Sequence, residues 1–152
     1  MFALLTVALF ITLGVAIVGW FRPVPAKPEA ASAPTYSSQQ VAGAKSKVCA
    51  AFEKADSAVK ATSARDKGSE YATQLATAVN VRQSLIAGSQ YLLTTLNNEP
   101  ATPSDLASNI RSLANAYQLL AIELQSDAPD SEKDPTVRSG DETTATLRNM
   151  CK

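Results

Sequence analysis

The chain has 152 residues, with 14 Lys and Arg balancing 14 Asp and Glu, two cysteines and no histidine. Because no basic stripe accompanies this zero net charge, we expect no nucleic-acid binding. The lack of histidine excludes imidazole bases, Ser-His nucleophile pairs, Glu-x-x-His di-iron sites and most catalytic zinc sites, so we expect a protein that is not an enzyme and carries no metal or cofactor.

The carboxylates do not change this expectation. Glu53 and Asp56 share a helix face but are surrounded by lysines, which indicates a solvated charged surface. The acidic stretch from Asp127 to Asp134 lacks the central Gly and terminal Glu of an EF-hand calcium loop. Neither group therefore predicts an acid/base pair or a calcium site.

The first segment, Met1 to Phe21, is free of charged side chains and is long enough, at about 20 residues, to cross a bilayer as a helix. A cleaved signal peptide has a basic start and a shorter apolar run. Trp20 and Arg22 at the end of the run suit the membrane interface, and Gly14 and Gly19 permit close approach of another helix. We expect a retained transmembrane anchor over residues 1–21.

Residues 22–36 are rich in proline and alanine, with Pro23, Pro25, Pro28 and Pro34 in this short stretch. Prolines at this density favour an extended polyproline-like spacer that rises about 3.1 Å per residue. The sequence therefore predicts a stalk over residues 22–36, followed by a folded domain over residues 37–152.

The domain begins with two predicted helices. Ser37 and Gln40 have the spacing of a capping box. Apolar residues at three- and four-residue steps then predict a helix to about Ser63: Val41, Ala44, Val48, Phe52, Ala55 and Val59. After the polar break over residues 64–68, a second stripe predicts a long helix that ends before Asn97: Tyr71, Leu75, Ala78, Arg82, Leu85, Ser89, Leu92 and Leu96.

A third helix has the clearest signals, with Thr102 as its cap and Pro103 at its first position. Its inner stripe is Leu106, Ile110, Leu113, Tyr117, Leu120 and Leu124. A polar loop over residues 126–133 then precedes a short last helix that starts at Asp134-Pro135, with inner positions Val137, Gly140, Thr144, Leu147 and Cys151. Four helices joined by short loops predict an all-α, antiparallel up-down four-helix bundle.

Cys49 and Cys151 are the two cysteines, and neither belongs to a Cys-x-x-Cys pair or a zinc-ligand spacing. At 1.5 Å per residue, Cys49 stands roughly 18 Å above the base of the first helix. The last helix descends roughly 26 Å from the top of a bundle about 40 Å tall, so Cys151 reaches nearly the same height. We therefore predict a Cys49–Cys151 disulfide; two free thiols in a cytoplasmic bundle remain the alternative.

Two signals on topology disagree. Arg22 and Lys27 follow the apolar run and nothing basic precedes it, which by the positive-inside rule favours a cytoplasmic domain. A disulfide needs an oxidising compartment. We give the cysteines more weight and expect a single-pass protein of the inner (cytoplasmic) membrane whose C-terminal domain lies in the periplasm.

The order of these segments also carries a resemblance. An apolar run that ends in Gly-Trp-Phe-Arg-Pro (19–23), an Ala/Pro stalk and the stretch Lys-Val-Cys-Ala-Ala-Phe (47–52) resemble small Ala/Pro-rich single-pass membrane proteins of mycobacteria. Glu-Pro-Ala-Thr-Pro (99–103) and the closing residues 147–152 are similar too. The resemblance implies a location in the mycobacterial cell envelope and no reaction.

Two functions fit these expectations. In the first, the protein is a non-catalytic accessory or assembly subunit of a larger integral membrane complex of the envelope, with a lipid-transport complex as the favoured host and the bilayer as a second partner. In the second, the bundle is a periplasmic carrier or sensor that holds a lipid or another apolar ligand between its helices. Arg82 lies beside the apolar stripe of the second helix, where it either extends to solvent at the bundle edge or contacts a partner or an anionic lipid.

Overall fold

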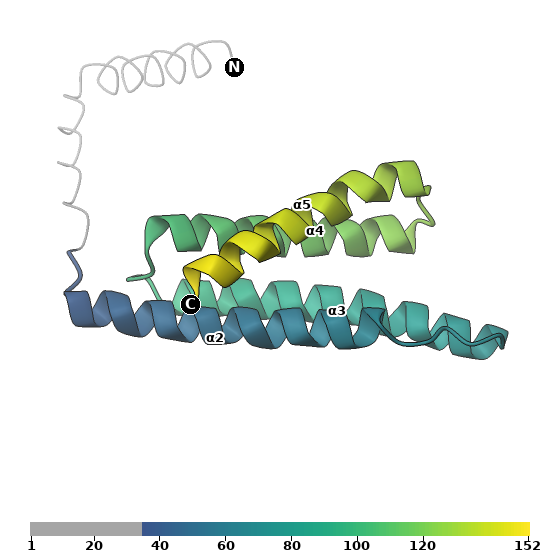
Figure 1. Cartoon of the computed structure of the whole chain (residues 1–152), viewed down its shortest axis with the longest axis horizontal. Helices are drawn as coiled ribbons and strands as arrows, with labels where there is room; N and C mark the ends of the chain where they lie inside the picture. Colours follow the sequence, from purple (N-terminus) through teal and green to yellow (C-terminus); the bar gives the residue numbers. More distant parts are fainter. Residues whose placement is uncertain (1–34) are drawn as a thin grey trace, which may run out of the picture. The chain divides into compact units, whose positions relative to one another are not determined.

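The computed structural model describes residues 35–152, which form four α-helices and no strand within that range (Figure 1). The helices are α2 (Ser38–Ser63), α3 (Tyr71–Asn98), α4 (Ser104–Gln125) and α5 (Asp130–Met150). The all-α fold is confirmed and is consistent with a helical bundle. The predicted anchor, and the predicted stalk up to residue 34, lie outside the described residues. None of the helices within residues 35–152 combines the length and apolar character that a membrane span requires.

The start of α2 agrees with the predicted capping box. The Gln40 N–H donates to Ser37 Oγ at 3.3 Å, and the Ser37 N–H donates to Gln40 Oε1 at 2.8 Å. At α4 the prediction was wrong by one residue, because Pro103 is the N-cap and the helix begins at Ser104. The Thr102 hydroxyl instead donates to the Glu99 carbonyl at 2.6 Å and thus stabilises the turn before the helix.

The predicted start of α5 was also wrong. The helix begins at Asp130, four residues before the predicted Asp134, and Pro135 lies inside it. The acidic residues that were assigned to a loop form the first turn, where Asp130 and Glu132 favour the positive end of the helix dipole. The turn that joins α4 to α5 is correspondingly short. In this turn Asp127 adopts a left-handed backbone, with φ 53°, and the Ala128 N–H donates to the Glu123 carbonyl at 2.9 Å.

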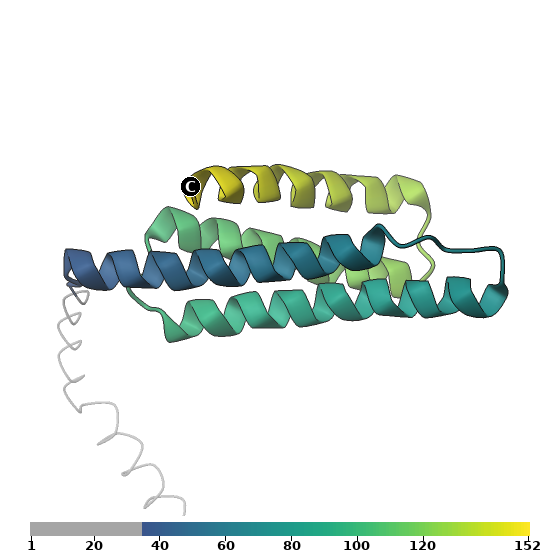
Figure 2. The same cartoon turned by 60° about the horizontal axis from the view of Figure 1, so that its bottom comes forward.

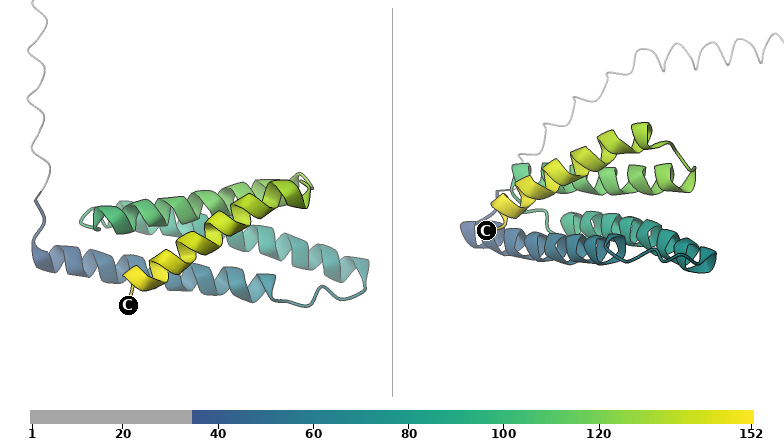
Figure 3. Two further views of the ribbon diagram at one scale, coloured as in Figure 1. Left: turned by 45° about the horizontal axis from the view of Figure 1, so that its top comes forward. Right: turned by 45° about the vertical axis from the view of Figure 1, so that its right-hand side comes forward.

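Consecutive helices run antiparallel and pack in chain order: α3 lies against α2 and α4, and α5 lies against α4 (Figure 2). Helix α5 crosses the others obliquely, and only its C-terminal end comes close to α2 (Figure 3). The sequence predicted that the last helix lies alongside the first. The structure brings these two helices together at a few residues only, so the bundle is open along much of the α2–α5 side.

The predicted disulfide is confirmed. Cys49 on α2 and Cys151 just after α5 are joined, with their Cα atoms 5.5 Å apart and a separation of 102 positions in the chain. Close to it, the Arg148 guanidinium on α5 lies 2.9 Å from the Asp56 carboxylate on α2. These two links hold the end of α5 against α2.

The hydrophobic core is concentrated at the end of the bundle that contains the disulfide. The large apolar side chains that are fully buried there are Val48, Phe52, Leu85, Leu92, Leu106, Ile110, Leu113 and Leu147. Toward the other end, the buried side chains are small or polar: Thr77, Ala121, Glu123, Ala128 and Thr136. The molecule therefore has a closed half with a packed core and an open half without one.

Three predicted inner positions are exposed in the open half. Tyr71 and Leu75 on α3 are 78% and 47% exposed, because this end of α3 is not covered by a neighbouring helix. Val137 is 41% exposed, and Thr136 is buried in its place. The oblique crossing of α5 over α4 turns Thr136 rather than Val137 toward the interior.

Candidate functional site

A cavity of about 490 Å³ lies in the wedge where α5 diverges from α2. All four helices contribute to its wall. The apolar and small residues that line it are Val59, Ser63, Val81, Leu85, Ala116, Tyr117, Leu120, Thr136, Val137, Gly140 and Thr144. We call this space the chain cavity. Its volume lies within the range of about 300–1,000 Å³ that is typical of small-molecule sites.

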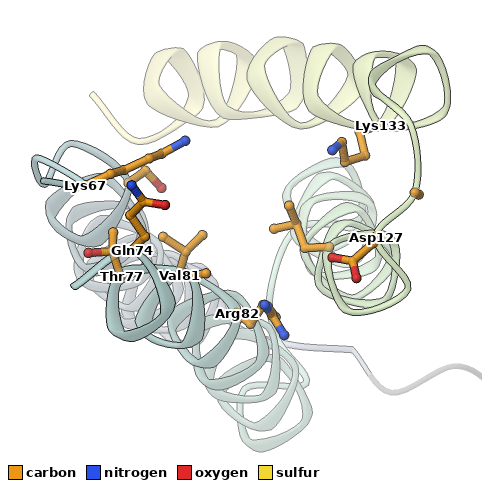
Figure 4. A pocket seen from close by; sticks show the side chains of 11 residues that line it. Lys67, Gln74, Thr77, Val81, Arg82, Asp127 and Lys133 are labelled. Carbon is orange, nitrogen blue, oxygen red and sulfur yellow. The ribbon is translucent and has the colours of Figure 1, made fainter. Parts of the chain in front are cut away.

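A second cavity, of about 340 Å³, opens beside it toward the turn between α4 and α5. Its wall is more polar, and Figure 4 shows Lys67, Gln74, Arg82, Asp127 and Lys133 around it. The full set of lining residues is Ser63, Lys67, Gln74, Thr77, Ala78, Val81, Arg82, Leu124, Asp127, Ala128 and Lys133. We call this space the polar cavity. Ser63 and Val81 line both cavities, so the two adjoin and form one groove between the α2–α3 pair and the α4–α5 pair.

Small side chains leave the groove unfilled. At Gly140 a Cβ would meet only the Cβ of Ala116, at 3.8 Å, so a glycine facing an alanine leaves space between α4 and α5. Within the wall formed by α2 and α3, the hydroxyl oxygens of Thr62 and Ser84 lie 2.7 Å apart and link the two helices by a hydrogen bond. The groove follows from this choice of residues and from the oblique course of α5.

The charges of the chain cavity balance one another. Asp56 accepts from Lys60 at 2.7 Å and from Arg148 at 2.9 Å, and Asp141 also lines the wall. Burial raises the pKa of Asp56 above its usual value, against the opposing effect of the Arg148 charge and hydrogen bond. Asp56 was expected on a solvated face; the structure instead places it partly inside, where it links α2 to α5.

Tyr117 gives the chain cavity a neutral aromatic wall. The residue is 7% exposed, and burial, followed by the negative charge of Asp56, raises its pKa to about 12. A phenol with this pKa stays protonated throughout the physiological pH range. The wall therefore presents an uncharged ring and a hydroxyl to anything bound beside it.

The polar cavity carries an excess of positive charge. Lys67, Arg82 and Lys133 line it together with one carboxylate, Asp127. Lys133 Nζ lies 3.0 Å from the exposed carboxylate of Asp130. Within residues 35–152, Lys67 and Arg82 form no ion pair. Arg82 is half-buried. Two cations at this end of the groove thus face the cavity without a protein carboxylate bound to them.

Glu123 is a buried acidic residue behind the groove. It is 6% exposed, its Oε1 accepts from the Thr136 hydroxyl at 2.8 Å, and its Oε2 has no partner. This hydrogen bond joins α4 to the N-terminal part of α5. It therefore fixes the side of the groove that Thr136 lines.

The residues singled out from the sequence are placed as follows. Cys49 and Cys151 form the disulfide, and Arg82 lies at the polar cavity. Gly14, Gly19, Trp20 and Arg22 lie outside the described residues. Within residues 35–152, no group of three or more acidic or cysteine side chains is arranged to hold a metal ion.

Apart from Arg82, the sequence did not indicate which residues line the groove. Lys67 lies in the break between the first two helices and Lys133 in a stretch predicted as a loop, so neither had a helical face assigned to it. Tyr117 was assigned to the core seam, and its position at a cavity depends on how far α5 stands from α2. The one available signal was Arg82, a cation beside an apolar stripe.

The comparisons with known proteins add no relative. The resemblance to mycobacterial membrane proteins therefore stays a prediction from the sequence. No family model matches the chain, and the searches of curated proteins and of solved structures found no match.

Proposed function

We propose that the protein is a non-catalytic binding protein that holds the apolar chain of an amphiphilic molecule in the groove between its helices. The observation that carries this proposal is the chain cavity itself, about 490 Å³ of space in a small bundle, with a wall surface that is mainly apolar. A bundle selected for stability alone would fill this wedge with large side chains, as it does around Phe52 and Ile110. Here the space is kept, and it adjoins a polar opening.

The proposed location agrees with this role. The uncharged run over residues 1–21 supports a membrane anchor, and the Cys49–Cys151 disulfide favours an oxidising compartment such as the periplasm. An anchored carrier or sensor in the cell envelope would take its ligand from, or present it to, the adjacent bilayer. A lipid or a lipid-derived molecule is the ligand class that this setting supplies.

The proposal predicts that a larger side chain at Val81 blocks binding. Val81 lines both cavities, so Val81→Phe places a ring at their junction. When a chain is bound, the added ring competes with it for the same space, and overpacking of this kind costs about 1–3 kcal/mol. We therefore expect the affinity for a neutral long-chain probe such as hexadecanol to fall roughly 10-fold or more. The measurement is displacement of a fluorescent apolar probe from the purified full chain.

Val79→Phe is the matched control, because Val79 lies on the same helix, is 39% exposed and lines neither cavity. We expect it to bind the probe as the wild type does. A wild-type protein that takes up no chain, or a Val81→Phe variant that binds as tightly as Val79→Phe, would contradict the proposal.

A second candidate function, accessory subunit of an envelope membrane complex, is favoured by a separate observation. Tyr71, Leu75 and Ile86 lie on one face of α3 and are 78%, 47% and 40% exposed. Large apolar side chains that stay exposed along one helix face are typical of a protein–protein contact. A lipid-transport complex would be a natural host for a subunit that also holds a lipid.

This second candidate predicts that a partner is recovered with the protein from native membranes. After purification of the full chain in mild detergent, mass spectrometry should find an integral membrane protein at constant ratio. We expect the Leu75→Lys/Ile86→Lys variant to lose it and Val81→Phe to keep it, since only the former alters the exposed face. Recovery of the wild type without any partner would remove this candidate and leave the carrier role standing alone.

A further inference from the structure

We infer that the ligand of the groove is an anionic single-chain amphiphile, whose carboxylate or phosphate binds Arg82 in the polar cavity, in the positive field of Lys67 and Lys133, while its chain occupies the chain cavity. The inference rests on the proposed function, because it assigns a chemical class to the ligand of that same groove. The polar cavity is then the end of the groove that binds the head group, and that head group carries a negative charge.

The unbalanced charge of the groove is confined to one end. In the chain cavity, two carboxylates, Asp56 and Asp141, face two cations, Lys60 and Arg148. Three cations and the single carboxylate of Asp127 line the polar cavity, and of these cations Lys133 is also paired with Asp130 at the surface, so a net positive charge remains. The groove is therefore neutral around its apolar part and cationic at its polar part, which is the charge pattern complementary to an anionic head group on an apolar chain.

The three cations come from both walls of the groove. Figure 4 shows Lys67 on the wall that includes α3 and Lys133 on the opposite wall, with both ammonium groups directed toward the space between the walls. Arg82 lies at the same cavity, apart from these two ammonium groups in Figure 4, and is half-buried. An anion in the polar cavity would thus lie in a positive field that comes from both walls.

Arg82 is the residue with the most to gain from an anion. A guanidinium donates two parallel hydrogen bonds to a carboxylate or a phosphate, and it does so most strongly where water is partly excluded. Its neighbour Asp127 lines the same cavity, but the ion pairs recorded within residues 35–152 do not join them. Lys133 is bound to Asp130, whose side chain is 89% exposed; an ion pair of this kind is weak and is readily exchanged for a ligand.

The apolar part of the groove fixes the rest of the ligand. Free phosphate or a short carboxylate would use the cations but leave the adjoining chain cavity empty. A cavity of about 490 Å³ is in the range of drug-sized ligands, which suits one chain rather than two. Tyr117, whose phenol is uncharged at physiological pH, presents a neutral ring to the chain.

The test compares chains that share a length and differ in head group. The probes are palmitate, palmitoyl lysophosphatidate, hexadecanol and hexadecyltrimethylammonium, each below the concentration at which it forms micelles. We expect the two anionic probes to bind the full chain at least roughly 10-fold more tightly than hexadecanol, and the cationic probe to bind least tightly. The better of the two anions identifies the head group. Added salt should weaken anion binding more than hexadecanol binding.

Variants test whether the preference for an anionic head group arises in the polar cavity. Arg82→Gln should weaken palmitate binding roughly 10- to 100-fold, the range expected for loss of a charge-assisted hydrogen bond, and leave hexadecanol binding nearly unchanged. Arg111→Gln, an exposed arginine on α4 that lines neither cavity, is the matched control and should bind both probes as the wild type does. Lys67→Gln, in the exposed segment between α2 and α3, repeats the test without touching a helix.

The outcomes separate this inference from the proposed function. Equal affinity for all four head groups, or tighter binding of the cationic probe, would overturn the anionic assignment while leaving a chain-binding groove in place. Binding of none of the four would overturn both. Loss of hexadecanol and palmitate together in Arg82→Gln would place Arg82 in the framework of the groove rather than at a head group and would likewise overturn the assignment.

Discussion

Reduction of the Cys49–Cys151 disulfide is expected to lower the free energy of unfolding by about 4–5 kcal/mol. The bond closes a loop of 102 positions, and in the chain-entropy description a loop of about 100 residues restricts the unfolded chain by this amount. Urea denaturation of the oxidised and the reduced full chain measures the difference. For a small domain whose total stability is roughly 5–15 kcal/mol, this loss is a large fraction of the total.

The Cys49→Ser/Cys151→Ser variant is the control for this prediction. Cys49 is 8% exposed, so its replacement also alters packing beside Phe52, whereas chemical reduction leaves both side chains in place. Agreement between the reduced wild type and the variant assigns the loss to loop closure. If reduction lowers the free energy of unfolding by less than about 1 kcal/mol, other contacts hold α5 in place and the prediction is refuted.

Because of where the disulfide lies, its reduction should loosen the end of α5 as well as lower the stability of the whole domain. Helix α5 packs on α4 and meets α2 at few residues, and the second link between them, Arg148 to Asp56, is an ion pair with one exposed partner. After reduction, the last turns of α5 should exchange their amide hydrogens faster than α4 does. Since α5 forms one wall of the groove, release of its end would also change the shape of the chain cavity.

The sequence was sufficient for those features that depend on local signals. The capping box at Ser37 and Gln40 and the inner stripes of α2 and α4 follow from residue spacing, and the structure has them. The disulfide also follows, because the heights of Cys49 and Cys151 depend on helix rise and on chain reversal at short loops. These quantities are nearly the same in every bundle.

The predictions that were wrong concern features that depend on how the helices cross. The stripe through Tyr71 and Leu75 is as regular as the rest of α3, yet no neighbouring helix covers it. The acidic residues before Pro135 look like a loop when Pro135 is taken as a helix start, and they form a helical turn because their charges suit the helix N-terminus. The groove itself depends on the oblique course of α5, which no periodicity in a single helix encodes.

Truncation of Phe52 to alanine is expected to cost about 3–5 kcal/mol of stability. Phe52 is 1% exposed in the closed half of the bundle, so removing its ring leaves an enclosed void as well as losing its transfer free energy. The matched comparison uses two valines of the same helix: Val48→Ala, where the side chain is 1% exposed in the closed half, and Val59→Ala, where it is half-buried and lines the chain cavity. Urea denaturation of the three variants beside the wild type gives the cost of each truncation.

For Val59→Ala we expect a cost of about 1 kcal/mol or less, because the truncation enlarges a cavity that is already open and creates no new enclosed void. Because both valine truncations remove the same atoms, the difference between Val48→Ala and Val59→Ala tests the division of the bundle into a closed half that supplies stability and an open half that is free to bind. Equal costs at Val48 and Val59 would mean that the groove is packed as tightly as the core. The space on which the binding proposal rests would then be absent, so a measurement of stability alone is able to remove its physical basis.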